Sequence, residues 1–277
     1  MMPVDIDAAV TRNRRLSADY NVVEFDAAAI ARTAGPGQFL MIKTSRGLDP
    51  LLRRPFSIFE ILRNNDGAPR GVSIFNKHIG AGTSLLAQVE PGARLQILGP
   101  LGRPFEPVDP PAEAWMVAGG VGLAPFVTLA EALVARGTRT MLFYGARRAE
   151  ELYCIELFES LRVRVILATE DGTRGVHGRV TVPLESALRE RPLGEPVKLF
   201  VCGPTSMMRA CAELSFRYGR ACDVSLEQVM GCGLGGCYSC VVPARTRDGG
   251  APHHTRTCID GPVFDAQRVV WDAMGSH

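Results

Sequence analysis

The residues best suited to chemistry are four cysteines near the C-terminus, three of them in the stretch MGCGLGGCYSC. Their spacing is C-x4-C-x2-C-x17-C, and they are Cys232, Cys237, Cys240 and Cys258. The stretch is dense in glycine, which adopts backbone angles closed to other residues. The chain can therefore bend sharply around a bound group and turn its N–H groups toward sulfur. Four thiolates on such a loop are suited to holding metal.

Two kinds of metal centre compete for these thiols. The first three spacings are typical of plant-type [2Fe–2S] ferredoxins. A structural zinc site is the alternative, but its usual signature is two short Cys or His pairs, whereas here the fourth cysteine stands alone. His253 and His254 precede Cys258, yet a Rieske centre would need each paired closely with a cysteine, so we expect solvated loop residues. We predict a [2Fe–2S] cluster.

Composition narrows the class of protein. The chain has 277 residues, is 46% hydrophobic and carries a net charge of +2, which fits two domains with separate cores. It has no basic tract, so we expect no nucleic-acid partner. The N-terminus lacks the apolar run of a secretory signal, and no apolar stretch is long enough to span a bilayer. We expect a cytoplasmic protein, whose eight cysteines are thiols or metal ligands. Three without ligand spacing are expected to be buried: Cys154, Cys211 and Cys222.

Hydrophobic patterning divides the chain into three parts. Residues 1–108 carry short alternating apolar runs at 39–43, 55–61, 71–78 and 94–100, which favour a small antiparallel barrel or sandwich. A proline-rich linker follows. Residues 109–222 alternate strands with helices, which predicts a Rossmann-like parallel sheet covered on both faces. The expected helices are 125–136, 149–161, 182–191 and 204–218. Residues 223–277 break this rhythm and contain the cysteine cluster.

Two turns in the second part are candidates for binding a nucleotide. The stretch VAGGVGLAP joins a predicted strand to a predicted helix and places Gly119, Gly120 and Gly122 where a phosphate or a nicotinamide could approach the backbone. The stretch VCGP ends a later strand with Cys202, Gly203 and Pro204. Ligands bind at the carboxyl ends of parallel strands, so both turns should line one crevice. Ordinary βα turns and a buried cysteine are the alternative.

Arginines raise two further questions about phosphates. Arg147 and Arg148 follow the second strand of this part, where an arginine would meet the 2′-phosphate of NADP, so the choice between NADH and NADPH stays open. In the barrel, Arg54 beside Pro55 could grip a pyrophosphate. Phe56 could pack on an aromatic ring system, and Ser57 offers a hydroxyl. Ordinary solvated arginines are the alternative in both places.

Together these motifs resemble a known family. A barrel with Arg-x-(aromatic)-Ser, a GxGxxP turn, a CGP strand end and a C-terminal cysteine cluster is similar to the ferredoxin-reductase superfamily. Within it, LRRPFSI, SLEQVMGCGLGGCYSC and DGPVFDA resemble the electron-transfer subunit of class 1B dihydroorotate dehydrogenase. The resemblance runs from about residue 10 to Trp271. Phe56 stands where the broader superfamily has tyrosine, and the gap before Cys258 is longer than expected, so residues 246–254 should loop out.

The resemblance implies the roles of individual residues. Arg54 would bind the FAD pyrophosphate and Ser57 would lie near the flavin N5, with Glu227 near the nicotinamide and the flavin. Ser57, Cys202 and Glu227 are the candidate catalytic residues, and the four cysteines would hold [2Fe–2S]. The FAD set is Arg54, Pro55, Phe56, Ser57, Phe75, Asn76, Lys77, Gly82 and Thr83. The nicotinamide set is Gly119, Gly120, Gly122, Cys202, Gly203 and Pro204.

The resemblance also implies a function. The expected route runs from NADH to FAD, then to [2Fe–2S], and then to a catalytic subunit that carries FMN and oxidises dihydroorotate. Nothing in the sequence resembles a (β/α)8 barrel, so we expect the orotate chemistry in a partner within a heteromeric complex. Three alternatives stay open. The first is a flavin reductase subunit that serves ferredoxin, a hydrogenase or a bifurcating complex. The second is a non-catalytic redox sensor, and the third is a zinc-stabilised scaffold.

Overall fold

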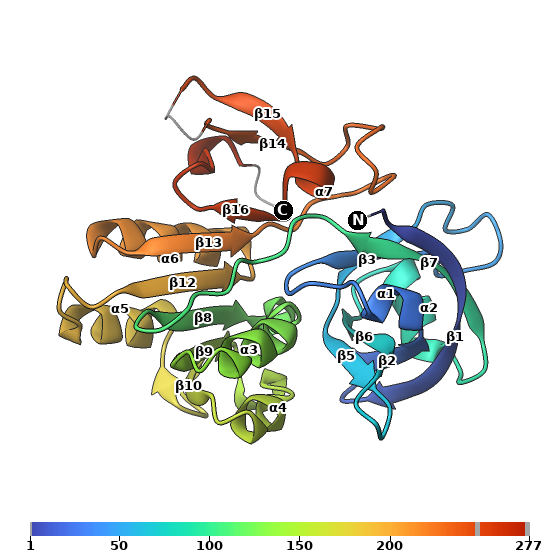
Figure 1. Ribbon diagram of the computed structural model, residues 1–277, viewed down its shortest axis with the longest axis horizontal. Helices are drawn as coiled ribbons and strands as arrows, with labels where there is room; N and C mark the ends of the chain where they lie inside the picture. Colours follow the sequence, from blue (N-terminus) through green and yellow to red (C-terminus); the bar gives the residue numbers. More distant parts are fainter. Residues whose placement is uncertain (1, 247–249, 275–277) are drawn as a thin grey trace.

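The chain folds into a barrel, a helix-flanked sheet and a C-terminal segment that lies across both (Figure 1). The computed structural model describes residues 2–246 and 250–274. This arrangement confirms the predicted combination of an antiparallel barrel, a parallel-sheet unit and a C-terminal cysteine loop. None of the helices formed by these residues has the length and apolar character needed to cross a membrane.

The barrel is an antiparallel seven-stranded sheet in the order β4-β3-β7-β1-β2-β6-β5. Its interior is filled by alternating apolar residues of all but the edge strands, such as Val23, Phe25 and Ile97. The predicted run 55–61 divides into two strands, and β1 and β2 were not anticipated. The strands are β1 (Val4–Arg15), β2 (Tyr20–Asp26), β3 (Phe39–Ile42), β4 (Arg54–Ser57), β5 (Glu60–Arg63), β6 (Pro69–Lys77) and β7 (Arg94–Leu101). The helices are α1 (Ala28–Ala31) and α2 (Ala81–Gln88).

The second sheet has the order β11-β10-β9-β8-β12-β13-β16, and only β16 runs antiparallel to its neighbour. Its strands are β8 (Glu113–Gly119), β9 (Thr140–Ala146), β10 (Arg164–Thr169), β11 (Val176–His177), β12 (Val197–Cys202), β13 (Ala221–Ser225) and β16 (Val263–Asp265). Alternate residues of β8 enter different cores: Met116 packs with Phe126 and Phe158, whereas Trp115 packs with Leu184 and Met208.

Helices cover both faces of this sheet, as predicted. They are α3 (Phe126–Ala135) and α4 (Ile155–Ser160) on one face, and α5 (Thr181–Glu190) and α6 (Thr205–Arg217) on the other. The expected helix 149–161 is divided into a short 3-10 turn, η2 (Ala149–Glu151), and α4. Cys154 lies between them with φ of 58°, a left-handed conformation that interrupts the helix. Cys154, Cys211 and Cys222 are buried, as expected.

The barrel and the parallel sheet share one core. Tyr20 and Phe75 of the barrel belong to the same buried cluster as Met116 and Phe126. Tyr153 joins them, with its ring centroid 4.8 Å from that of Tyr20. Because side chains interdigitate across this boundary, the barrel and the parallel sheet are held in a fixed relative position.

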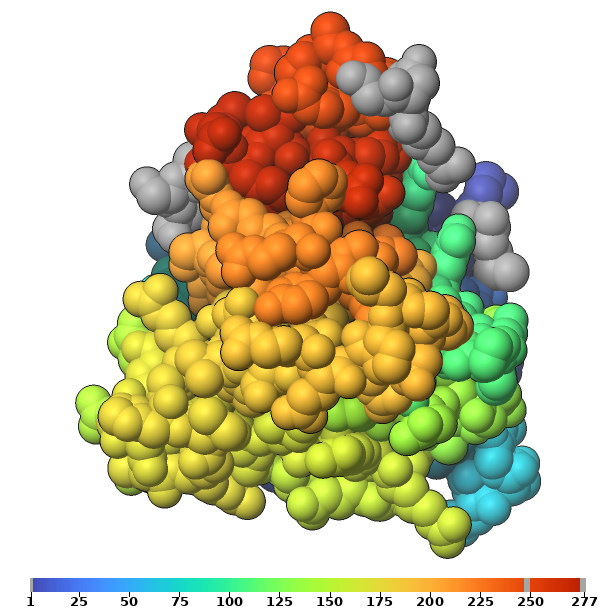
Figure 2. Space-filling model, turned by 90° about the vertical axis from the view of Figure 1, so that its left-hand side faces the viewer, coloured from blue at the N-terminus to red at the C-terminus, as the bar shows by residue number. Residues whose placement is uncertain are grey.

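The C-terminal segment contacts both units. Its hairpin of β14 (Val241–Ala244) and β15 (His253–Arg256) leads into α7 (Thr257–Asp260), after which β16 pairs with β13. A last turn, η3, spans Trp271–Ala273. Figure 2 shows this segment, in red, stacked on the orange part of the chain. The predicted boundary between residues 222 and 223 falls inside β13, and the division into domains stays a prediction. Of the residues expected to loop out, 247–249 lie outside the described residues, while His253 and His254 open β15.

Candidate functional site

The two nucleotide-binding turns lie directly against each other. Gly122, in η1 (Gly120–Leu123) after β8, is so close to the end of β12 that a Cβ atom on it would lie 2.3 Å from the Cys202 carbonyl oxygen. A Cβ on Gly203 would lie 3.1 Å from the Gly119 backbone nitrogen. Gly120 has φ of 55°, which favours glycine. The glycines therefore bring the carboxyl ends of β8 and β12 together, at the edge where open parallel sheets bind their ligands.

Cys202 faces an acidic neighbour at this edge of the sheet. Burial, together with the charge of Glu227, raises the pKa of the Cys202 thiol to about 12. The thiol is therefore neutral at physiological pH and offers a polarisable surface without charge. Glu227 itself is exposed, so the structure brings it close to Cys202 and leaves its carboxylate accessible.

The flavin candidates Arg54 and Gly82 are in contact. A Cβ atom on Gly82 would lie 3.2 Å from Cγ of Arg54 and 3.4 Å from Oγ1 of Thr44. Thr44 Oγ1 is buried and has no hydrogen-bond partner among the described residues. An unpartnered hydroxyl, an arginine and the free N–H groups at the start of α2 form a cradle that suits a diphosphate. The sequence did not indicate Thr44, because a lone threonine in a loop has no recognisable pattern.

The remaining flavin candidates do not all face one space. Ser57 and Phe56 lie on the edge strand β4 and are half-buried. Phe75 is buried in the shared core, with ring centroids 5.5 Å from Tyr20 and from Phe59. Asn76 donates to Asn21 Oδ1 at 2.8 Å and to the Thr83 carbonyl at 3.0 Å, so it ties β6 to α2.

Thr83 and Lys77 complete this segment. Thr83 Oγ1 accepts hydrogen bonds from the backbone N–H groups of Ile79 and Gly80 and so caps α2. Lys77 lies over the ring of Tyr20, its ammonium 5.5 Å from the centroid. A Cβ on Gly120 would have the Tyr20 hydroxyl as its neighbour at 3.9 Å. The barrel thus presents a tyrosine and a lysine to the nicotinamide turn, and Tyr20 was not indicated by any sequence motif.

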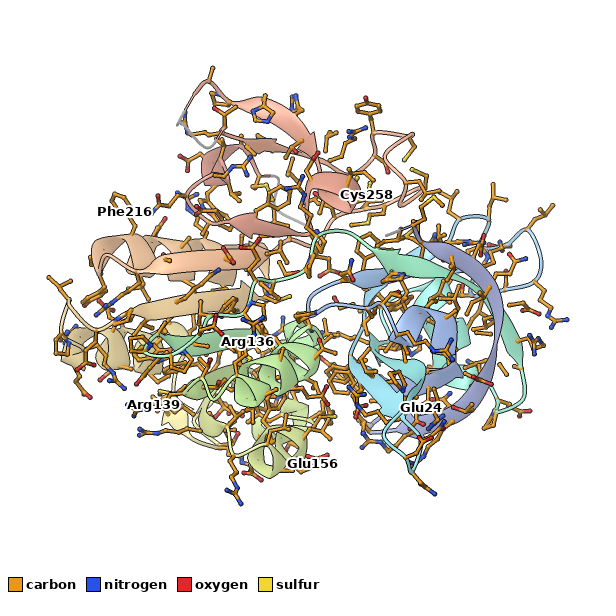
Figure 3. All side chains as sticks on the ribbon, viewed as in Figure 1. Glu24, Arg136, Arg139, Glu156, Phe216 and Cys258 are labelled. Carbon is orange, nitrogen blue, oxygen red and sulfur yellow. The ribbon has the colours of Figure 1, made fainter. Side chains whose placement is uncertain are left out.

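The four motif cysteines lie in the C-terminal segment, where Figure 3 labels Cys258. Cys240 and Cys258 are buried in a cluster with Phe39 and Met41 of β3. Left-handed glycines shape the loop: Gly233 and Gly235 have φ of 72° and 79°. A Cβ on Gly233 would lie 2.5 Å from Met41 Cγ, so only glycine lets this loop pack on the barrel.

The thiols fall into two pairs, Cys232 with Cys237 and Cys240 with Cys258, each within hydrogen-bonding reach. Hydrogen bonds from the Ser239 side chain and backbone, and from Cys232, lower the pKa of the Cys237 thiol to about 6. Burial, together with the Cys240 thiol, raises the pKa of Cys258 to about 12. The outer thiol therefore ionises readily, whereas the inner one stays protonated until a metal displaces its proton.

The donor set fits a binuclear cluster better than a single metal ion. Two cysteine pairs match a [2Fe–2S] cluster, whose two irons each take two protein ligands. Backbone N–H groups also point at sulfur, including that of Leu234 at 3.3 Å from Cys232 Sγ. Such hydrogen bonds tune the cluster potential.

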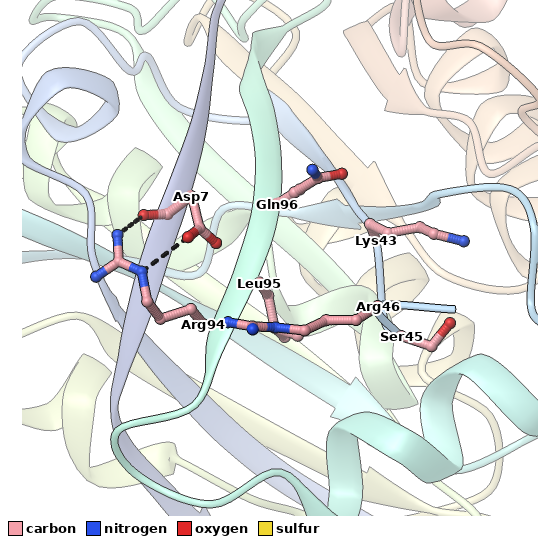
Figure 4. A pocket seen from close by; sticks show the side chains of 7 residues that line it. All are labelled: Asp7, Lys43, Ser45, Arg46, Arg94, Leu95 and Gln96. Atoms are coloured by element: carbon pink, nitrogen blue, oxygen red, sulfur yellow. Dashed lines mark hydrogen bonds and ion pairs between the residues drawn. The ribbon is translucent and has the colours of Figure 1, made fainter. Parts of the chain in front are cut away.

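One hollow of the barrel surface contains none of the predicted site residues. It has a volume of about 320 Å³. Arg94 donates to the carboxylate and to the backbone oxygen of Asp7 on its wall (Figure 4). Lys43 donates to the carbonyl of Leu51 at 2.9 Å and so holds the following loop. These hydrogen bonds show that Arg94 and Lys43 stabilise the barrel and its following loop. The lining residues are Asp7, Lys43, Ser45, Arg46, Arg94, Leu95 and Gln96.

The barrel, the paired glycine turns and the cysteine loop define an iron–sulfur member of the ferredoxin-reductase-like oxidoreductases. Residues 116–213 match the family described as an oxidoreductase NAD-binding domain, and residues 227–270 match the iron–sulfur cluster binding domain of dihydroorotate dehydrogenase B. The chain belongs to the family of dihydroorotate dehydrogenase B electron transfer subunits. It is 37% identical to the one from Desulforamulus reducens, across 96% of this chain and 98% of that protein. The subunit of Fusobacterium nucleatum is 31% identical, over 95% of this chain and 97% of its own length.

Solved structures show the same architecture. An NADH-dependent reduced ferredoxin-NADP oxidoreductase, studied for flavin-based electron bifurcation, aligns with a TM-score of 0.82 and 26% identity, covering 96% of this chain and 90% of its own. The ferredoxin reductase of carbazole 1,9a-dioxygenase aligns with a TM-score of 0.67 over 79% of this chain and 67% of its own. At 23% identity, this second likeness concerns the fold alone.

Proposed function

We propose that this chain is the electron-transfer subunit of a heteromeric dihydroorotate dehydrogenase. It takes electrons from NADH and passes them through FAD and a [2Fe–2S] cluster to an FMN-containing catalytic subunit. Family membership carries this proposal, and the contacts of the barrel with the nicotinamide turn and with the cysteine loop support it.

The barrel contacts both of the other two candidate sites. Ser57 pairs with Phe39 of β3, and Phe39 packs in the buried cluster that contains Cys240 and Cys258. On the other side, Tyr20 of the barrel approaches Gly120 of the nicotinamide turn. A flavin bound along β4 would therefore lie within one strand of the cysteine loop, on a barrel that also contacts the nicotinamide turn.

Nicotinamide gives up two electrons as a hydride and [2Fe–2S] accepts one at a time, and a bound flavin converts between the two. The task of the chain is to position these groups. Arg54 and the start of α2 would hold the FAD diphosphate, and Ser57 would face the isoalloxazine ring. The backbones of Gly119, Gly120 and Gly122 leave room for the nicotinamide ring.

Cys202 and Glu227 line the nicotinamide side of the crevice. The neutral thiol of Cys202, with Gly203 and Pro204, would pack against the nicotinamide ring, and the exposed carboxylate of Glu227 would lie near it. Pro55, Phe56, Phe75, Asn76, Lys77, Gly82 and Thr83 complete the flavin segment; Asn76 and Thr83 act by fixing β6 and α2. The cluster is held by Cys232, Cys237, Cys240 and Cys258.

The catalytic partner docks beside the cysteine loop. Apolar side chains surround this loop while remaining in solvent: Tyr238 is 63% exposed, Leu234 54% and Ile259 39%. Exposed apolar groups gathered around a functional centre mark a protein–protein interface. This placement brings the cluster close to the acceptor.

An anaerobic titration with NADH tests the proposal. We expect NADH to bleach both a flavin band and the broad cluster absorbance. Addition of the catalytic subunit and dihydroorotate with NAD+ should then yield orotate. Arg147 and Arg148 follow β9, where an arginine could bind the 2′-phosphate of NADPH. A parallel titration with NADPH therefore resolves the choice of electron donor. A colourless protein containing zinc would refute the proposal.

A flavin reductase subunit of a bifurcating complex is the second candidate function. It is favoured by the TM-score of 0.82 to a structure studied for flavin-based electron bifurcation. Reduction of ferredoxin by NADH, without orotate formation on adding the dihydroorotate dehydrogenase catalytic subunit, would identify it.

A further inference from the structure

A second pocket lies on the flank of the cysteine loop and has no part in the proposed electron route. Its volume is about 310 Å³, at the lower end of the range for small-molecule sites. The barrel, the hairpin and the C-terminal end of the chain all contribute to its wall. The lining residues are Arg103, Tyr238, His253, His254, Thr255, Arg256, Asp260 and Arg268.

Three arginines converge on this pocket from separate parts of the sequence. Arg103 follows the barrel and is fixed by its backbone N–H, which donates to the Gly261 carbonyl at 2.6 Å. The Arg268 side chain donates through Nε to the Arg245 carbonyl at 3.0 Å. Arg256 donates to the Gly235 carbonyl at 3.2 Å and lies 5.5 Å from the Tyr238 ring centroid. Each guanidinium keeps further N–H donors for a ligand.

The single carboxylate of the pocket does not neutralise these charges. One oxygen of Asp260 already accepts from Thr255 Oγ1 at 2.9 Å and from the Arg256 backbone N–H at 3.1 Å. Three arginines against one carboxylate leave an excess of two positive charges in a concave site.

We propose that this pocket binds a phosphate-bearing oxyanion. Guanidinium groups recognise phosphate oxygens through two parallel hydrogen bonds, and three of them around one cavity suit a compact group with several negative charges.

Calorimetric titration of the holoprotein with inorganic pyrophosphate tests the site. Saturating NAD+ is included because the nicotinamide crevice also recognises phosphates. We expect one saturable site, weakened by about tenfold or more in the double variant Arg103→Gln/Arg268→Gln. Arg256 is left intact because it holds the cysteine loop. The control Arg12→Gln/Arg189→Gln removes the same charge from exposed arginines elsewhere, on β1 and α5, and should bind as the wild type does.

Two further measurements complete the test. Flavin and iron contents check that the double variant is folded, and Arg268→Gln alone replaces it if they fall. A nucleoside monophosphate is titrated in parallel, and its Kd is compared with that of pyrophosphate. The lower Kd shows whether the site prefers an organic or an inorganic phosphate. No binding by the wild type, or equal binding by wild type and arginine variants, overturns the proposal.

Discussion

Gly122 and Cys202 are in direct backbone contact although eighty residues separate them, and no side chain larger than hydrogen fits at position 122. The nearest atom to a Cβ there would be the Cys202 carbonyl oxygen, at 2.3 Å. A carbonyl on a buried strand cannot move aside as a flexible side chain can. The contact therefore couples the two turns of the proposed nicotinamide site.

Gly122→Ala should separate these turns. Overpacking of this kind costs about 1–3 kcal/mol, and the displacement falls on the nicotinamide crevice. We expect a raised KM for NADH and a lowered kcat with unchanged flavin and iron content, measured by steady-state reduction of an artificial acceptor. Gly194→Ala is the matched control, because a Cβ there meets nothing within 4 Å. Wild-type kinetics in Gly122→Ala would contradict the assignment of the crevice.

Gly233→Ala should remove the cluster and spare the flavin. Gly233 has φ of 72°, and a Cβ on it would lie 2.5 Å from Met41 Cγ. Backbone strain and the clash together cost about 2–4 kcal/mol, concentrated in the loop that holds the thiols. We expect a lowered ratio of iron to flavin, determined by chemical analysis and visible absorption.

Gly236→Ala tests the same loop without the clash. Its Cβ meets nothing within 4 Å, and its backbone is not left-handed. It should keep the wild-type iron content. Equal loss in both variants would mean that the whole loop, rather than its seat on Met41, is sensitive to substitution.

Local patterns predicted much of the fold because they act over short distances. The cysteine spacing, the glycine turns and most strands and helices follow from a few adjacent residues. The expected helix 149–161 was interrupted because Cys154 adopts a left-handed conformation, which the residue type does not signal. Strand β1 was missed because much of it is exposed and charged, so its apolar alternation is weak.

Contacts between distant segments were harder to predict. The rule that ligands bind at strand ends correctly brought the Gly122 and Cys202 turns together. No pattern indicated that β16 would pair with β13, since the antiparallel register depends on the path of the whole C-terminal segment. Tyr20 and Thr44 were missed for the same reason: they reach the candidate sites only through the packing of other elements.

Neutralising Glu131 should stabilise the protein at neutral and alkaline pH. Burial raises the pKa of Glu131 on α3, and the charge of Glu60 on β5 raises it as well. Because the pKa of Glu131 is higher in the folded chain than its unfolded value near 4.5, the free energy of unfolding decreases as the pH rises above 4.5. The loss is complete once the pH exceeds the pKa of the folded state. Glu131→Gln removes this penalty.

The gain should vanish as the pH falls toward 4.5. We expect a higher midpoint of urea unfolding for Glu131→Gln at pH 8, followed by tryptophan fluorescence, with wild type and variant converging near pH 4.5. Because Glu131 is half-buried, the effect is no larger than about 1 kcal/mol. The exposed Glu159→Gln on α4 removes the same charge and should change little. A gain that persists at pH 4.5 would have a cause other than ionisation.

Leu234→Glu should weaken assembly with the catalytic subunit without affecting internal electron transfer. Leu234 lies in the cysteine loop and is 54% exposed, and only its backbone N–H is directed at Cys232. A charge at the centre of an apolar interface should raise the Kd by about tenfold or more, measured by calorimetry. Leu193→Glu is the control. Leu193 is 80% exposed and lies in the turn before the amino end of β12, away from the strand ends that face the barrel. NADH should reduce the flavin and cluster of both variants at the wild-type rate. If Leu193→Glu weakened the complex and Leu234→Glu did not, the docking face would lie on the parallel-sheet unit instead.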